Sequence, residues 1–123
     1  MRSRMRLGKR IVTVTAGVMA AAAMAFAHSH PKTMDPAPNA TIAAPQRVSI
    51  EFSEALEPKF SSLKLTDAKG ANAANAASQV DPADAKHMTL ALPHLAPGIY
   101  TVHWVTVATD GHRLEGEYKF TVK

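Results

Sequence analysis

Strict alternation of apolar and polar residues recurs along this chain, and it constrains the fold more than any other feature. The segment R-V-S-I-E-F, residues 47–52, sets three large apolar side chains against three polar ones. The segments H-M-T-L-A-L, residues 87–92, and E-Y-K-F-T-V, residues 117–122, repeat the pattern. Because successive side chains of a strand point to opposite faces, each segment is expected to be a half-buried β-strand.

Two further segments complete the expected strands. G-I-Y-T-V-H-W-V-T-V, residues 98–107, is long and rich in β-branched residues. Phe60, Leu63 and Leu65 continue another expected strand, which includes S-S-L-K-L-T, residues 61–66. No helix of convincing length is indicated. Short strands bounded by Pro and Gly turns predict an all-β fold, a single antiparallel β-sandwich.

Two segments depart from the alternation. Residues 28–45 contain four prolines, which exclude a central strand and allow only an edge segment. A-N-A-A-N-A-A-S-Q, residues 71–79, is low in complexity and shows no apolar period. We expect the second segment to be an exposed excursion.

The first 27 residues have the layout of a secretory signal peptide. Five basic residues within the first ten precede an uncharged run that ends in A-F-A. A basic region, an apolar region and a small-residue cleavage site are the three parts of such a signal. Cleavage after Ala27 would leave residues 1–27 as the signal peptide and residues 28–123 as one mature domain. The apolar run is short for a membrane span, which needs about 20 apolar residues. We therefore expect an exported protein that is not embedded in the membrane after cleavage.

The formal net charge of +4 belongs to the precursor. Residues 28–123 keep nine Lys and Arg against ten Asp and Glu, and the basic residues are scattered, which argues against a nucleic-acid partner. The chain has no cysteine, so it forms neither a disulfide nor a thiolate metal site.

The turn T-D-G-H, residues 109–112, is the strongest candidate for chemistry. Asp110 and His112 are two residues apart, so an open turn lets both side chains address one ion. The plainer interpretation is a D-G hairpin turn that carries a surface histidine. These residues alone leave both interpretations open.

His28 extends the candidate ligand set. After cleavage its free α-amine and its ring nitrogen Nδ1 can close a chelate ring on a metal ion. Together with Asp110 and His112 this gives three nitrogens and one carboxylate oxygen. Such a set favours copper(II), with zinc as the second choice.

His30 offers a competing or auxiliary ligand. In the sequence His28-Ser29-His30, the α-amine, two deprotonated amides and the imidazole of His30 can bind copper(II) in a plane without any fold. The two modes compete because both use the α-amine.

The remaining candidates are weaker. His103 is expected to be structural, and His87 and His94 to be solvated near turns. Glu51 and Glu54 either orient a ligand imidazole or are ordinary solvated charges. No G-x-S-x-G, Gly-rich phosphate loop or H-E-x-x-H motif occurs, so we expect no enzyme of those classes.

Several motifs, taken together, resemble one known family. After export the chain is expected to begin at a histidine. That histidine is followed by A-A-P-Q-R-V-S-I-E-F-S-E, P-G-I-Y-T-V-H-W, T-D-G-H and G-E-Y-K-F-T-V, in that order. This series is similar to that of the CopC family of periplasmic copper-resistance proteins, and it covers essentially all of residues 28–123.

The resemblance implies a Greek-key β-sandwich of cupredoxin-like shape, a periplasmic location and one bound copper(II) ion. It implies His28, Asp110 and His112 as metal ligands, and Glu54 as an outer-sphere residue that hydrogen-bonds near the ion. Some members also carry a methionine-rich copper(I) site, but E-A-L-E-P-K-F-S-S-L-K, residues 54–64, has no methionine.

The resulting expectation is a non-catalytic, monomeric copper(II)-binding protein of copper resistance or homeostasis. A CopD-type inner-membrane copper transporter is the partner that the resemblance implies. Two alternatives remain open at this point. One is a copper-dependent oxidase in which an amino-terminal histidine braces the metal, and the other is a structural β-sandwich whose histidines are incidental.

Overall fold

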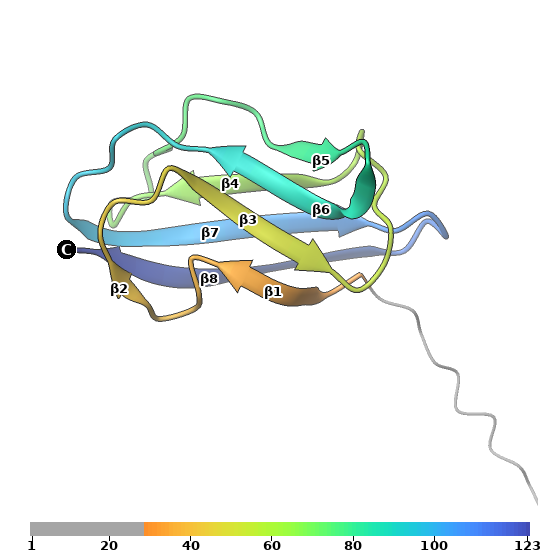
Figure 1. Ribbon diagram of the computed structural model, residues 1–123, viewed down its shortest axis with the longest axis horizontal. Coiled ribbons are helices and arrows are strands. Elements are labelled where there is room, and N and C mark those ends of the chain that lie inside the picture. The colour runs from red at the N-terminus through yellow and green to blue at the C-terminus, as the bar shows by residue number, and fades with distance from the viewer. Residues whose placement is uncertain (1–28) are drawn as a thin grey trace, which may run out of the picture.

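A computed structural model describes residues 29–123, so the expected signal peptide, residues 1–27, and His28 lie outside the described residues. Eight strands and no helix occur within 29–123 (Figure 1). The strands are β1 (Pro31–Asp35), β2 (Thr41–Ile42), β3 (Arg47–Phe52), β4 (Ser62–Thr66), β5 (Gln79–Asp81), β6 (Asp84–Ala91), β7 (Gly98–Val107) and β8 (Arg113–Val122).

The strands form two four-stranded sheets that face each other. The first sheet has the order β1-β3-β6-β5 and the second has the order β2-β8-β7-β4. Every pair is antiparallel except β2 with β8, which is parallel. The predicted all-β sandwich is therefore confirmed, and the proline-rich segment supplies β1 at a sheet edge, as expected.

The alternating residues of the strands fill the space between the sheets. The large apolar side chains of β3 are all buried, and the inward-facing ones of β6, β7 and β8 belong to the same core. The most completely buried members of this core are Val48, Ile50, Phe52, Leu65, Met88, Leu90, Val102 and Phe120. Trp104 packs against the core edge-on to Phe52, with ring centroids 5.9 Å apart.

The prediction that Phe60 continues this strand was wrong, because Phe60 lies in a turn before β4, where its side chain is 65% exposed. The amide of Phe60 donates to the carbonyl of Glu57 and closes a turn, and strand β4 begins only at Ser62. The alternation of residues 61–66 therefore does not extend back to Phe60.

The excursion at residues 71–79 is mostly exposed, but Ala74 is buried and β5 begins at Gln79.

Three segments that are distant in sequence meet at one end of the sandwich. They are the turn between β7 and β8, the loop that follows β3, and the residues that lead into β1 (Figure 1). The isolated bridge between Leu56 and Ala108 fastens the loop to the turn. This end of the molecule holds the residues singled out by the sequence, and it is called the hairpin end below.

Candidate metal centre

The longest hairpin of the fold holds the T-D-G-H turn at its tip. Strands β7 and β8 pair without interruption from Gly98 and Val122 to Val107 and Arg113. Beyond the ladder, the amide of Ala108 donates to the carbonyl of His112 at 3.0 Å. Gly111 takes a φ of +89°, a left-handed conformation that glycine adopts without a steric penalty. The sequence therefore makes a tight turn here and presents its side chains at a fixed place.

Asp110 and His112 are in direct contact. Asp110 Oδ2 lies 3.0 Å from His112 Nδ1, and Asp110 Oδ1 accepts a hydrogen bond from the main-chain amide of His112, also at 3.0 Å. The two side chains are 45% and 55% exposed, so an ion can reach them from solvent. The structure thus brings together two of the three predicted ligands, a carboxylate and an imidazole, which suit copper(II) and zinc alike.

The residue after His28 is fixed at the same end. Ser29 is 1% exposed, and its hydroxyl donates to the carbonyl of Glu54 at 3.1 Å. The next residue of that loop, Ala55, accepts a hydrogen bond from the amide of Thr109, at the start of the turn. The loop after β3 therefore connects the beginning of the described chain to the Asp110–His112 pair.

The other predicted site residues have mixed outcomes. His28 lies outside the described residues, and its role stays a prediction. Glu54 belongs to the hairpin end, where its main-chain carbonyl accepts the hydrogen bond from Ser29. His30 is exposed, and its ring lies beside Ser53. No cluster of three or more His, Cys, Asp or Glu side chains placed to hold a metal occurs within residues 29–123. Of His28, Asp110 and His112, residues 29–123 contain the last two, and the possible auxiliary ligand His30 also lies in this part of the chain.

The remaining histidines lie elsewhere. His103 faces outward from β7, where Nδ1 is 3.1 Å from Glu117 and Nε2 is 2.9 Å from Thr66. His87 lies in β6 beside Asp84, and the hydrogen bonds from the Lys86 amide and the His87 ring hold the pKa of Asp84 below its usual value. These contacts agree with the expectation of structural or solvated histidines.

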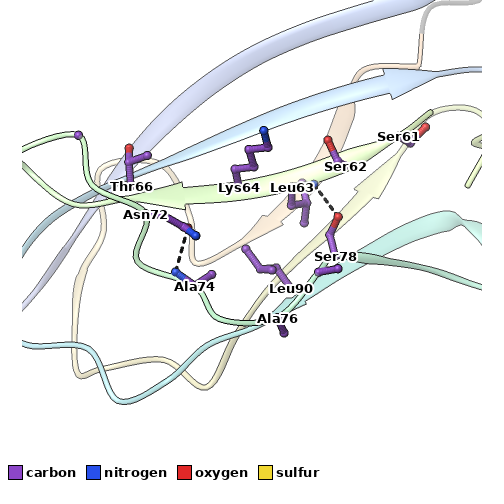
Figure 2. A pocket seen from close by; sticks show the side chains of 12 residues that line it. Ser61, Ser62, Leu63, Lys64, Thr66, Asn72, Ala74, Ala76, Ser78 and Leu90 are labelled. Carbon is purple, nitrogen blue, oxygen red and sulfur yellow. Dashed lines mark hydrogen bonds between the residues drawn. The ribbon is translucent and has the colours of Figure 1, made fainter. Parts of the chain in front are cut away.

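A cavity of about 500 Å³ lies away from the hairpin turn, between β4 and residues 70–78. Figure 2 shows Leu63 and Leu90 among the lining residues, with the Ser78 hydroxyl accepting a hydrogen bond from the amide of Leu63. Its twelve lining residues include no imidazole, carboxylate or thioether. The chemistry of this lining does not suit a copper ion, so the candidate metal centre is at the hairpin end.

Three residues of the hairpin end were missed by sequence reasoning. Ser29, Ser53 and Thr106 all hold the start of the described chain, through contacts that span 23 to 77 positions. Thr106 had one available signal, because it is a polar residue on the otherwise apolar inner face of β7, two positions from Trp104. Nothing in the sequence distinguished the two serines.

The β-sandwich with an Asp-Gly-His hairpin at one end can be placed in a class by comparison with known proteins. A family model described as "CopC domain" matches residues 31–123. Copper resistance protein C of Escherichia coli is 40% identical over 114 residues, covering 86% of this chain and 90% of that protein. The crystal structure of CopC from Methylosinus trichosporium OB3b superposes with a TM-score of 0.73 at 32% identity, covering 78% of this chain and 94% of that one.

The chain therefore belongs to the CopC family. The copper transport protein CutJ of Bacillus subtilis also contains a similar region, 28% identical over 99 residues, which covers 79% of this chain and 18% of that protein. A helix long and apolar enough to cross a membrane is not found among residues 29–123.

Proposed function

We propose that residues 28–123 form a copper(II)-binding protein of the periplasm that acts in copper resistance or homeostasis, by sequestration or delivery, without catalysing a reaction. Residues 1–27 direct its export and are removed. One ion per chain is held by His28, Asp110 and His112, and the Glu54 side chain hydrogen-bonds near the ion. All proposed ligands come from one chain, so a monomer suffices.

The contact between Asp110 and His112 is the observation that carries this proposal. The pair lies on the β7–β8 hairpin, is open to solvent and sits at the end where Ser29 is fixed. An amino-terminal histidine directly before Ser29 begins at this same end of the sandwich, and we expect it to add its two nitrogens there. Three nitrogens and one oxygen suit a tetragonal copper(II) site.

A membrane copper transporter of the CopD type is the proposed partner. Similarity between this chain and 18% of the copper transport protein CutJ supports this role, because the name of that protein links a region of this kind to copper transport.

Copper(II) affinity of the mature protein tests the site. His112→Ala and Asp110→Ala should each weaken binding by at least about 100-fold, because even residues that only orient a ligand typically contribute 10- to 100-fold. The measurement is a competition titration against a chelator of known affinity, with spin-resonance spectra to count nitrogen ligands.

His94→Ala is the matched control, because His94 is exposed in the loop that precedes β7, far along the sheet from the hairpin turn. It should leave the affinity unchanged. Equal affinity in the His112→Ala and Asp110→Ala variants would reject the proposed site. Oxygen consumption above that of free copper, with a reductant present, would reject the non-catalytic role.

A further inference from the structure

The peptide bond between Ser29 and His30 is held to the fold at both of its polar groups. The carbonyl of Ser29 accepts a buried hydrogen bond from Thr106 Oγ1 at 2.8 Å, and the amide of His30 donates to Ser53 Oγ at 3.1 Å. Because a trans peptide is planar, its C=O and N–H point in opposite directions. The two contacts therefore hold this peptide from opposite sides.

Burial protects one of these contacts from water. Ser29 is 1% exposed and Thr106 is completely buried. Thr106 lies in β7 between two sheet partners, so its hydroxyl has a fixed position. A hydrogen bond in such a place persists unless the segment leaves the fold as a whole.

Ser53 also contacts the ring of His30. Its hydroxyl oxygen lies 3.2 Å from His30 Nδ1, and its amide donates to the carbonyl of His30 at 2.9 Å. The amide nitrogen and the Nδ1 atom of His30 thus lie against the same oxygen atom.

These are atoms that the local copper chelate would need. That chelate uses the α-amine of His28, the deprotonated amides of Ser29 and His30, and Nδ1 of His30, all in one plane around the ion. Ser53 lies against two of these four nitrogens, and Thr106 holds the carbonyl of the intervening peptide. The local chelate therefore requires Ser29 and His30 to leave the fold.

We propose that Thr106 and Ser53 form a clamp on the Ser29–His30 peptide and thereby select which copper chelate forms. The clamp blocks the local chelate and keeps the nitrogens of His28 available to Asp110 and His112. Thr106 and Ser53 are positioning residues, since they act on the ligand set through the backbone of residues 29–30. This inference rests on the proposed function, in which copper(II) binds through the α-amine of His28.

The test removes the clamp from the mature protein. Ser53→Ala, Thr106→Val and the double variant are titrated with copper(II), alone and combined with His112→Ala or His30→Ala. Each lost hydrogen bond should favour the local chelate by about 3- to 10-fold. A synthetic peptide of residues 28–33 supplies the reference spin-resonance and visible spectra of the local chelate.

With the clamp intact, affinity should depend on His112 and be nearly indifferent to His30→Ala. In the double variant, the spectrum should move toward that of the peptide, and His30→Ala should now weaken binding while His112→Ala has a smaller effect. Thr106→Ser retains the hydroxyl and should keep the intact spectrum. Thr101→Val, on the outer face of the same strand, is the control for β-branched substitution.

Three outcomes separate the clamp from the proposed function. If the double variant keeps the intact spectrum and the full dependence on His112, the clamp is rejected while the proposed function stands. If the intact protein already gives the peptide spectrum and ignores His112→Ala, both are rejected. If circular dichroism shows that the double variant does not fold, Ser53→Ala alone decides, because Ser53 is a partly exposed loop residue. An unchanged copper spectrum in Ser53→Ala then rejects the clamp.

Discussion

At the scale of single residues, two tyrosines on neighbouring strands use their hydroxyl groups differently. Tyr100 donates a hydrogen bond to the carbonyl of Ala96 at 2.7 Å and stacks on Phe120. The hydroxyl of Tyr118 is buried and has no hydrogen-bond partner among residues 29–123. Burial, and to a smaller extent the carboxylate of Asp35, raises the pKa of Tyr118 well above its usual value.

The raised pKa of Tyr118 predicts a loss of stability at alkaline pH. An unfolded tyrosine loses its proton near pH 10, whereas Tyr118 in the folded protein keeps it. The contribution of Tyr118 to the free energy of unfolding is therefore complete below about pH 10. It declines as the pH rises further, because the unfolded state then binds fewer protons than the folded state. Urea unfolding at pH 7 and above pH 10 should show the decline in the wild type and a smaller one in Tyr118→Phe.

Tyr100→Phe provides the matched comparison. At pH 7 it should lower the free energy of unfolding by about 0.5–1.5 kcal/mol, because a made hydrogen bond is lost. Tyr118→Phe should be neutral or stabilising at that pH, because it removes a buried hydroxyl that lacks a partner. An alkaline loss in Tyr118→Phe as large as in the wild type would contradict the assignment to Tyr118.

At the scale of elements, the β7–β8 hairpin places the candidate ligands. Its turn depends on Gly111, whose φ of +89° is unfavourable for residues with a side chain. Apart from the two chain neighbours of Gly111, no atom of residues 29–123 lies within 4 Å of where a Cβ would be, so the restriction is conformational and not a matter of space.

Gly111→Ala should therefore destabilise the protein by about 1–2 kcal/mol and also weaken copper(II) binding, because relaxation of the turn separates Asp110 from His112. Gly111→Asn is the matched control, since asparagine tolerates the left-handed region better. Chemical denaturation and copper titration of both variants measure the effect. Equal losses for Ala and Asn would show that the backbone conformation of Gly111 is not the cause.

At the scale of the whole molecule, the proposed site exists only when three segments come together. The start of the described chain, the loop after β3 and the hairpin turn meet through contacts such as Ser29 to Glu54 and Leu56 to Ala108. An ion bound across these segments stabilises the folded state, because the unfolded chain does not hold the ligands in place.

Copper(II) should accordingly stabilise the mature protein against heat. At a free copper concentration 100-fold above the dissociation constant, linkage predicts about 2.7 kcal/mol of added stability. One glycine placed before His28 should abolish most of this shift, since the α-amine then no longer belongs to His28. Thermal unfolding with and without copper(II) measures the rise in unfolding temperature. An equal rise in the protein with the added glycine would contradict a role for the α-amine.

Local pattern was sufficient for much of the fold. The alternation at residues 47–52 and 98–107 predicted β3 and β7 with their boundaries, because a buried face requires that period. It did not predict β2 or β5, which are only two and three residues long and pair through tertiary context. It misplaced Phe60 because a turn interrupts the strand there.

For the candidate site, the sequence by itself determined the donor types and the turn that joins Asp110 to His112, because both lie within three residues and the Asp-Gly step specifies the local geometry. Only the tertiary structure decided that Ser29 is hydrogen-bonded to Glu54, in the loop after β3, and to Thr106, in β7. Those contacts join residues 25 and 77 positions apart, and no local preference encodes a hydrogen bond over such a separation. The packing of two sheets brings them together.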